Sequence, residues 1–259
     1  MTSTSHAIAV VLLTTCRASM VRAVRSVYLQ QFDGDPQHIH LLIGVDCDPH
    51  RQLDELMAIL APERPPHVTI SIINPGYSTS RRHGGVHTSH YGGSLRSVLT
   101  LLADSEIVTY LDDDDWFKEN HCARILHAIE GKKWAYTYSI YADGNTAQEL
   151  CVDEIESVGV GRGIYAQKFG GFVRPTGLAI NKMELLHLVH LWSCSPFASG
   201  DGEDRLVFDK LRTEPYGCTD VATVCCSLDP KDGNHELRMQ FIRSRGIDYQ
   251  VGVKVDSTR

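Results

Sequence analysis

The stretch Ile107-Val108-Thr109-Tyr110-Leu111-Asp112-Asp113-Asp114-Asp115-Trp116-Phe117 indicates the fold class. Its first five residues favour an extended, half-buried backbone, so they predict a central β-strand that ends at the aspartates. Ligands of open α/β sheets bind beyond the carboxyl ends of the strands. Four adjacent carboxylates repel one another, and a hard divalent cation such as Mg²⁺ or Mn²⁺ would neutralise them and bind a substrate's phosphates. The stretch therefore indicates either a metal and diphosphate site or a solvated acidic turn.

Strand and helix patterns alternate along the chain on both sides of this stretch. Continuous apolar runs predict buried strands, and apolar residues three and four apart predict helices. Strands are expected at 8–13, 40–45, 67–73, 134–141, 176–180 and 221–228, and helices at 18–32, 51–60, 94–102, 122–129, 182–192 and through 206–211. The alternating order in the first half of the chain specifies an α/β fold with a mostly parallel, doubly wound sheet.

Two glycine-rich segments do not fit this alternation. The segment 74–93 is rich in Gly, Ser and His and has no periodicity, and a loop of that length inside a domain is more often functional than idle. The segment 159–171 lacks the Gly-x-Gly-x-x-Gly spacing of a dinucleotide fingerprint, so it is expected to be irregular chain.

Length, composition and charge restrict the class of protein. The 259 residues suffice for one large α/β domain or two small ones, and 42% hydrophobic with 22% charged residues is ordinary for a globular protein. The net charge of −7 gives no general attraction for nucleic acids. No apolar run reaches the ~18 residues of a membrane span, and residues 1–6 lack the basic region of a signal peptide. We therefore expect a cytoplasmic protein without a transmembrane segment.

The eight cysteines are scattered without a Cys-x-x-Cys pair, and most lie in apolar surroundings. In a reducing compartment they are expected to be free thiols. Adjacent Cys225 and Cys226 with His83, His87 and His90 lack the ligand spacing of structural zinc sites, so zinc is disfavoured.

A second acidic feature, Glu203-Asp204, precedes the helical pattern through 206–211. Acids in the first turn of a helix interact favourably with the helix dipole, so capping explains them as readily as chemistry does.

Taken together, these motifs resemble family 2 of the glycosyltransferases with the GT-A fold, over about 210 residues from Ala7 to Leu211. The family pattern is matched by Thr14 to Arg17 after the first strand, Ser26, Val27 and Gln30 on the next helix, Asp46 after the second strand, Arg96 of an Ala-Arg-Asn segment whose other two positions differ, Asp112 to Trp116 for the Asp-x-Asp motif, and the pair Glu203-Asp204. The resemblance implies a single GT-A domain over 1–259, with helices on both faces of a Rossmann-like sheet. Residues 1–117 would form the nucleotide-sugar-binding half, 118–228 the acceptor-binding half, and 229–259 a C-terminal loop and tail.

The implied activity is a metal-dependent, inverting transfer of a sugar from a nucleoside-diphosphate sugar, UDP-sugar favoured, to an acceptor hydroxyl, with Mn²⁺ or Mg²⁺ as cofactor. The resemblance assigns the donor contacts to Thr14, Arg17, Asp46, Arg96, Asp112 and Asp113. It assigns the metal to Asp114, Asp112 and His235, and the catalytic base to Asp204, with Glu203 second. Side chains alternate along a strand, so Asp112 and Asp114 are expected to point to the same side. Arg238, Arg243 and Arg245 would bind the diphosphate or form a solvated basic face.

Three alternatives remain open from the sequence. A sugar nucleotidyltransferase also uses strand-end acids and a metal, but usually has a glycine-rich segment after its first strand, and Thr14 to Arg17 contains no glycine. A GT-A domain that binds sugar nucleotides without turnover is favoured only if the Glu203-Asp204 pair is absent. A metal-dependent phosphatase is expected to carry its nucleophilic aspartate after the first strand.

Overall fold

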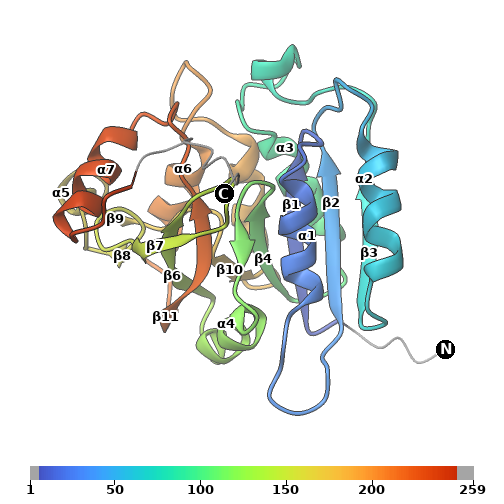
Figure 1. Cartoon of the computed structure of the whole chain (residues 1–259), viewed down its shortest axis with the longest axis horizontal. Coiled ribbons are helices and arrows are strands. Elements are labelled where there is room, and N and C mark those ends of the chain that lie inside the picture. The colour runs from blue at the N-terminus through green and yellow to red at the C-terminus, as the bar shows by residue number, and fades with distance from the viewer. Residues whose placement is uncertain (1–5, 250–259) are drawn as a thin grey trace, which may run out of the picture.

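The computed structural model describes residues 6–249 of the chain, so the start at residues 1–5 and the end of the predicted tail, 250–259, lie outside it. Nine strands form one sheet in the order β3-β2-β1-β4-β10-β6-β11-β5, and β7 pairs with β6 (Figure 1). Their bounds are β1 Ile8–Thr14, β2 Ile39–Val45, β3 Val68–Ile73, β4 Ile107–Asp112, β5 Trp116–Phe117, β6 Trp134–Ala142, β7 Glu149–Val152, β10 Leu178–Asn181 and β11 Tyr216–Ser227. A separate two-stranded sheet joins β8, Gly159–Val160, to β9, Gly171–Phe172.

The α-helices are α1 Met20–Tyr28, α2 Leu53–Leu60, α3 Gly93–Leu102, α4 His121–Ile129, α5 Ala166–Phe169, α6 Glu203–Leu211 and α7 His235–Ser244. Three 3₁₀ helices are η1 Ala61–Glu63, η2 Arg81–His83 and η3 Leu186–Ser193.

The sheet is mostly parallel, as the alternating sequence pattern predicts. The strands β1 to β4 pair in parallel, and β6 pairs in parallel with β11. The strand β10 is antiparallel to both β4 and β6, so it joins the two groups while keeping them in the same direction. The carboxyl ends of these strands therefore lie at one edge of the sheet, where the acidic stretch ends β4.

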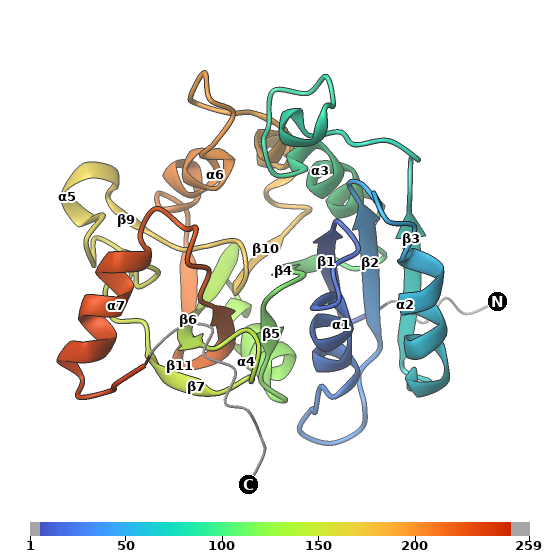
Figure 2. The same cartoon turned by 45° about the horizontal axis from the view of Figure 1, so that its top comes forward.

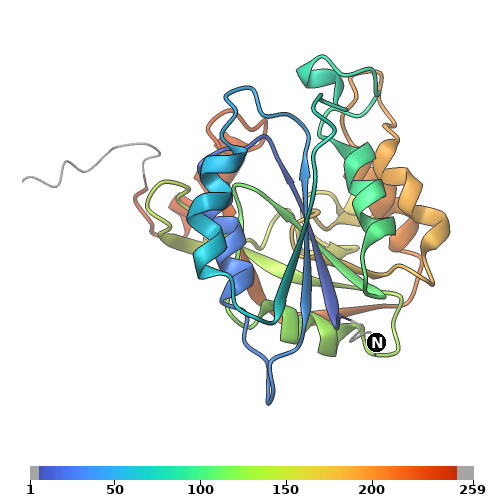
Figure 3. The ribbon, with the colours of Figure 1, turned by 90° about the vertical axis from the view of Figure 1, so that its right-hand side faces the viewer.

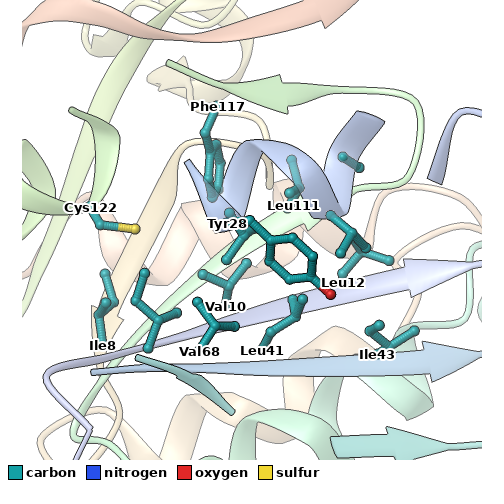
Figure 4. Packing of buried hydrophobic residues seen from close by; sticks show 14 of the residues in the cluster. Ile8, Val10, Leu12, Tyr28, Leu41, Ile43, Val68, Leu111, Phe117 and Cys122 are labelled. Carbon is teal, nitrogen blue, oxygen red and sulfur yellow. The ribbon is translucent and has the colours of Figure 1, made fainter. Parts of the chain in front are cut away.

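Each face of the sheet has its own hydrophobic core, because successive side chains of a strand point to opposite faces. Ile8, Val10 and Leu12 of β1 pack under α1, α2 and α4 (Figure 4). The alternate residues of β1 pack on the other face with α3, η3 and α6. Figure 3 shows α1 and α2, in blue and cyan, on one side of the sheet and α3 on the other. The expected α/β fold with helices on both faces is confirmed.

The segment 182–192, predicted to be a helix, begins as a turn and continues as the 3₁₀ helix η3 instead of an α-helix. Residues three apart align on a 3₁₀ helix, so Val189 and Trp192 both point into the core beside α3. The packing is close: a Cβ atom added to Gly93 of α3 would lie 1.8 Å from the Trp192 carbonyl oxygen. Ser97 of α3 also donates a hydrogen bond to the Val189 carbonyl at 2.9 Å. The contacts with α3 thus favour a 3₁₀ helix over the α-helix that the apolar spacing suggests.

Two further segments differ from the sequence-based expectation. The predicted C-terminal loop and tail contains helix α7, whose Met239 and Ile242 pack against Tyr141. The irregular segment 159–171 contains α5 between the paired strands β8 and β9. The 74–93 loop has the expected irregular form, with η2 as its one helical turn.

All eight cysteines are free, as predicted. Within residues 6–249, none of the helices combines the length and the apolar character needed to cross a lipid bilayer.

Candidate active site

A cavity of about 810 Å³ lies at the carboxyl ends of β1, β2 and β4. Its volume lies in the range of about 300–1,000 Å³ that is usual for ligand sites. The 74–93 loop, the 197–205 segment and the 227–238 segment form its other walls, and Figure 2 shows these segments converging beyond the strand ends. Nine of the ten predicted site residues line it: Thr14, Arg17, Asp46, Arg96, Asp112, Asp113, Asp114, Glu203 and Asp204. The tenth, His235, does not.

The four aspartates form two pairs with different surroundings. Strand β4 ends at Asp112, and the Asp115 amide donates to the Asp112 carbonyl at 3.1 Å, which closes a turn over Asp113 and Asp114. Asp114 therefore lies in a turn and not on the strand, so the alternation of side chains along a strand does not determine where it points. Asp113 is buried and accepts a hydrogen bond from Thr14 Oγ1 at 2.7 Å. Asp115 is also buried and accepts one from the Ser227 amide at 2.9 Å.

The other two aspartates face the cavity. The side chains of Asp112 and Asp114 are 38% and 35% exposed. Asp112 Oδ2 and Asp114 Oδ1 have no hydrogen-bond partner among the described residues, and two such carboxylate oxygens suit a hard divalent cation. Within residues 6–249 no third protein ligand joins them in a tight cluster, so waters and substrate phosphates would complete the coordination of a Mg²⁺ or Mn²⁺ ion.

Two arginines reduce the negative charge of the turn. Arg17 forms ion pairs with Asp113 and with Asp114, the latter at 3.3 Å. Buried Arg96 donates from Nη2 to Asp112 Oδ1 at 2.9 Å, and its guanidinium lies 4.9 Å from the Trp192 ring centroid. Burial raises the pKa of the Asp114 carboxyl, Arg17 opposes that rise, and the Asp112 and Asp113 charges add to it. The repulsion between these neighbouring carboxylates would be reduced by a further cation bound at the turn.

A third arginine holds the backbone of the acidic turn. Arg22 of α1 donates to the Asp114 carbonyl at 3.3 Å and to the Gly144 carbonyl at 2.7 Å. Its guanidinium also lies 4.0 Å from the centroid of the Trp116 ring. No sequence motif indicated this contact, because it joins segments more than 90 residues apart.

The acid pair Glu203-Asp204 begins α6 at the cavity wall. The preceding Gly202 has φ +86°, and a Cβ atom there would lie 2.8 Å from the Phe197 ring, so the turn that aims the helix requires glycine. Burial raises the pKa of Glu203 to about 7, with Arg96 opposing the rise. Glu203 Oε2 is buried without a hydrogen-bond partner among residues 6–249. Partly buried Asp204 also has its pKa raised by burial. Burial therefore makes both carboxylates better proton acceptors than exposed ones, which suits a general base.

Asp46 is held by the 74–93 loop. Its Oδ1 accepts hydrogen bonds from the Thr79 amide and hydroxyl at 2.9 and 2.8 Å and from the Ser80 amide at 3.2 Å. Its Oδ2 accepts one from Ser78 Oγ at 2.9 Å. The loop thus covers the aspartate predicted to contact the nucleotide base, a contact that the aperiodic loop sequence did not indicate.

A buried charge network forms the C-terminal wall of the cavity. Glu156 Oε2 accepts hydrogen bonds from Arg238 Nε at 2.6 Å and Arg174 Nη2 at 3.3 Å, and Oε1 accepts one from Asn234 Nδ2 at 2.6 Å. Arg238 also pairs with Asp232 at 3.1 Å. The sequence singled out Arg238 but not its partners, because Glu156 and Arg174 belong to segments without a motif.

The remaining C-terminal candidates lie away from the cavity. His235 is the first residue of α7 and its side chain is not in the cavity lining, although Asp232 and Asn234 are. Arg243 and Arg245 are also outside the lining and pair with Glu236 and Glu154 respectively.

No protein-family model matches the sequence, and a search of curated proteins finds no significant match. The fold does match solved structures of S. aureus TarS. The chain superposes on TarS with a TM-score of 0.59 and 13% identity, covering 94% of this chain and 40% of TarS. The complex of TarS 1–349 with UDP-GlcNAc matches with a TM-score of 0.58 and 12% identity, covering 95% of this chain and 68% of that one. TarS 1–349 has also been solved with UDP.

The chain thus has the fold of GT-A glycosyltransferases, and it spans about 40% of the length of TarS. At this level of identity the likeness shows the fold, and the assignment to family 2 stays a prediction.

Proposed function

We propose that the protein is a metal-dependent, inverting glycosyltransferase of the family 2 type, which transfers a sugar from a UDP-sugar to an acceptor hydroxyl. One observation carries the proposal: a single cavity brings the outward carboxylates of Asp112 and Asp114 together with Glu203 and Asp204, about 90 residues further along the chain. The first pair suits a cation that binds a diphosphate, and the second suits proton abstraction.

The donor half of the site would bind the nucleotide sugar through residues at the ends of β1 and β2. Arg17 is half-exposed and its forked donors suit a diphosphate, while it pairs with buried Asp113, which accepts a hydrogen bond from Thr14. Asp46 and the 78–80 segment would contact the base. The nucleotide is taken to be UDP because TarS, which shares the fold, binds UDP and UDP-GlcNAc.

The metal would be held by Asp112 and Asp114. When bound, Mn²⁺ or Mg²⁺ supplies Lewis-acid stabilisation of the charge that develops on the departing diphosphate. Arg17 can bind the same phosphates, because its ion pairs with Asp113 and Asp114 place its guanidinium at the turn.

The acceptor half would remove the proton of the attacking hydroxyl. We assign this step to Asp204, which lines the cavity and is more exposed than Glu203, and keep Glu203 as the second candidate. A hydroxyl that attacks in line, as it loses its proton, inverts the anomeric carbon. Since burial raises the pKa of both carboxyls, transfer is expected to decline with falling pH at a higher pH than for an unperturbed carboxylate base.

Release of UDP from UDP-GlcNAc, UDP-glucose and UDP-galactose with Mn²⁺ or Mg²⁺ tests the proposal. Asp204→Asn is expected to lower the rate by about 10²–10⁴-fold. Asp209→Asn is the matched control, because Asp209 lies on the same helix, pairs with Arg212 at the surface and is outside the cavity lining.

The products separate the alternatives. Diphosphate formed from a sugar phosphate and UTP indicates a nucleotidyltransferase, and sugar-nucleotide binding without UDP release indicates a binding domain. A transferred sugar that retains its anomeric configuration would remove Asp204 as the base.

A further inference from the structure

We propose that Asp46, Cys47 and His83 form a site for a borderline-soft divalent cation, Zn²⁺, which fastens the 74–93 loop to the end of β2. One ligand atom from each side chain lies within 4.8 Å of the others, and in residues 6–249 no other three His, Cys, Asp or Glu side chains approach as closely. The site is separate from the Asp112 and Asp114 pair.

The backbone already places these three side chains together. Asp46 and Cys47 directly follow β2, and His83 is the last residue of η2 in the loop. The loop is bound to Asp46 through Ser78 Oγ at 2.9 Å and through the Thr79 amide at 2.9 Å. These hydrogen bonds hold the loop near Asp46 in the absence of a metal ion.

The ligand atoms suit zinc better than the ions proposed for the acidic turn. Thiolate, imidazole and carboxylate are each ligands that Zn²⁺ takes in proteins, and a water would fill the fourth position, whereas Mg²⁺ and Mn²⁺ prefer oxygen. Asp46 Oδ2 accepts only the Ser78 hydrogen bond among the described residues, so it has a free lone pair for the ion.

The local charge also favours a cation. Asp46 and Asp48 flank Cys47, and Asp48 is bound to the Gln52 and Leu53 amides at 2.8 and 3.0 Å. Formation of the Zn–S bond would release the thiol proton of Cys47 to solvent.

Occupation of this site would give His83, a loop residue outside the cavity lining, a function that the proposed transfer reaction does not explain. The loop has only η2 as regular structure, and its other attachments lie at Arg81, which donates to the Ala198 carbonyl at 3.1 Å, and at His90, whose amide donates to the Gly200 carbonyl at 2.9 Å. A zinc ion would join the loop to the sheet at one further point. The site shares Asp46 with the proposed contact to the base, so the inference is tested by zinc binding itself and not by sugar transfer.

Metal-free protein would be titrated with Zn²⁺ in competition with a chromophoric chelator, and separately with Co²⁺. We expect one Zn²⁺ per chain, and a thiolate-to-Co²⁺ charge-transfer band. Cys47→Ser and His83→Ala should each weaken zinc binding at least about tenfold, and Cys47→Ser should abolish the band. Cys194→Ser and His127→Ala are the controls, since these residues lie outside the loop and the cavity lining. Zinc binding that is absent, or unchanged in both ligand variants, would overturn the inference.

A second measurement follows the loop directly, through its cleavage by a protease. Arg81 and Arg82 are exposed, so trypsin is expected to cleave the metal-free protein there. Zinc should slow this cleavage several-fold in the natural sequence and leave it unchanged in His83→Ala. Equal cleavage rates with and without saturating zinc in the natural sequence would show that the ion does not fasten the loop.

Discussion

The four aspartates of the acidic motif have two different roles, which alternate along the chain. Asp113 and Asp115 are buried and hold the turn to Thr14 and to the Ser227 amide, whereas Asp112 and Asp114 keep free oxygens toward the cavity. The sequence identified all four aspartates as a cluster. It could not separate the two pairs, because their partners lie about 100 residues away on either side and only the folded sheet brings them together.

Glu203 should destabilise the folded protein at the pH where it is ionised. Its pKa rises from the ordinary 4.5 to about 7, so the folded state holds the proton more tightly than the unfolded state does. Protonated Glu203 therefore stabilises the folded state fully below pH ~4.5, and this stabilisation is lost as the pH rises through ~7. Glu203→Gln should therefore raise the free energy of unfolding at pH 8 by up to about 3 kcal/mol, with little change at pH 4.

Urea unfolding at the two pH values measures this difference. Asp209→Asn, at the surface of the same helix, should show no such pH-dependent gain. A Glu203→Gln variant that is less stable than the natural sequence at pH 8 would mean that the ionised carboxylate is stabilised in the fold.

At the scale of elements, helix α7 depends on one buried acid from a distant segment. Glu156 is 2% exposed and binds Arg238 and Asn234 at the start of the helix. Glu156→Gln removes the charge that compensates Arg174 and Arg238, and breaking a buried ion pair typically costs about 3–5 kcal/mol. We expect a loss of stability of this order.

Glu154→Gln is the matched control, because Glu154 is exposed and pairs with Arg245 at the surface. Hydrogen exchange should show that protection of the α7 amides falls in Glu156→Gln and not in Glu154→Gln. Unchanged protection in both variants would show that α7 is held by its apolar contacts alone.

The elements that the sequence predicted best are those with a strong local pattern. The apolar runs of β1 and β2 and the strand before the aspartates were placed to within a few residues. Helix α7 was missed because only two of its buried residues are apolar, which is too few for a helical pattern in the sequence. The third buried residue, Arg238, is held by Glu156. The 3₁₀ form of η3 was missed because Val189 and Trp192 are placed by α3. Both depend on contacts distant in sequence.

At the scale of the whole molecule, one sheet runs through both predicted halves of the chain. Strand β4 of the first half pairs with β10 of the second, through Val108 with Ile180 and Thr109 with Ala179. We therefore expect unfolding in urea to be one cooperative transition, with coincident curves from circular dichroism and from tryptophan fluorescence. Two separated transitions would indicate that the halves are independent domains.

The central claim is that a nucleotide binds in the cavity through a metal at the acidic turn. The most direct test is the thermal stabilisation of the protein by UDP, GDP, CDP and their sugar conjugates, each with and without Mn²⁺. A ligand at about 100 times its Kd should stabilise the folded state by about 2.7 kcal/mol. We predict stabilisation by UDP and UDP-sugars that requires Mn²⁺ or Mg²⁺, is lost in Asp114→Asn and persists in Asp209→Asn. No stabilisation by any nucleotide, or an equal effect in Asp114→Asn, would contradict the account.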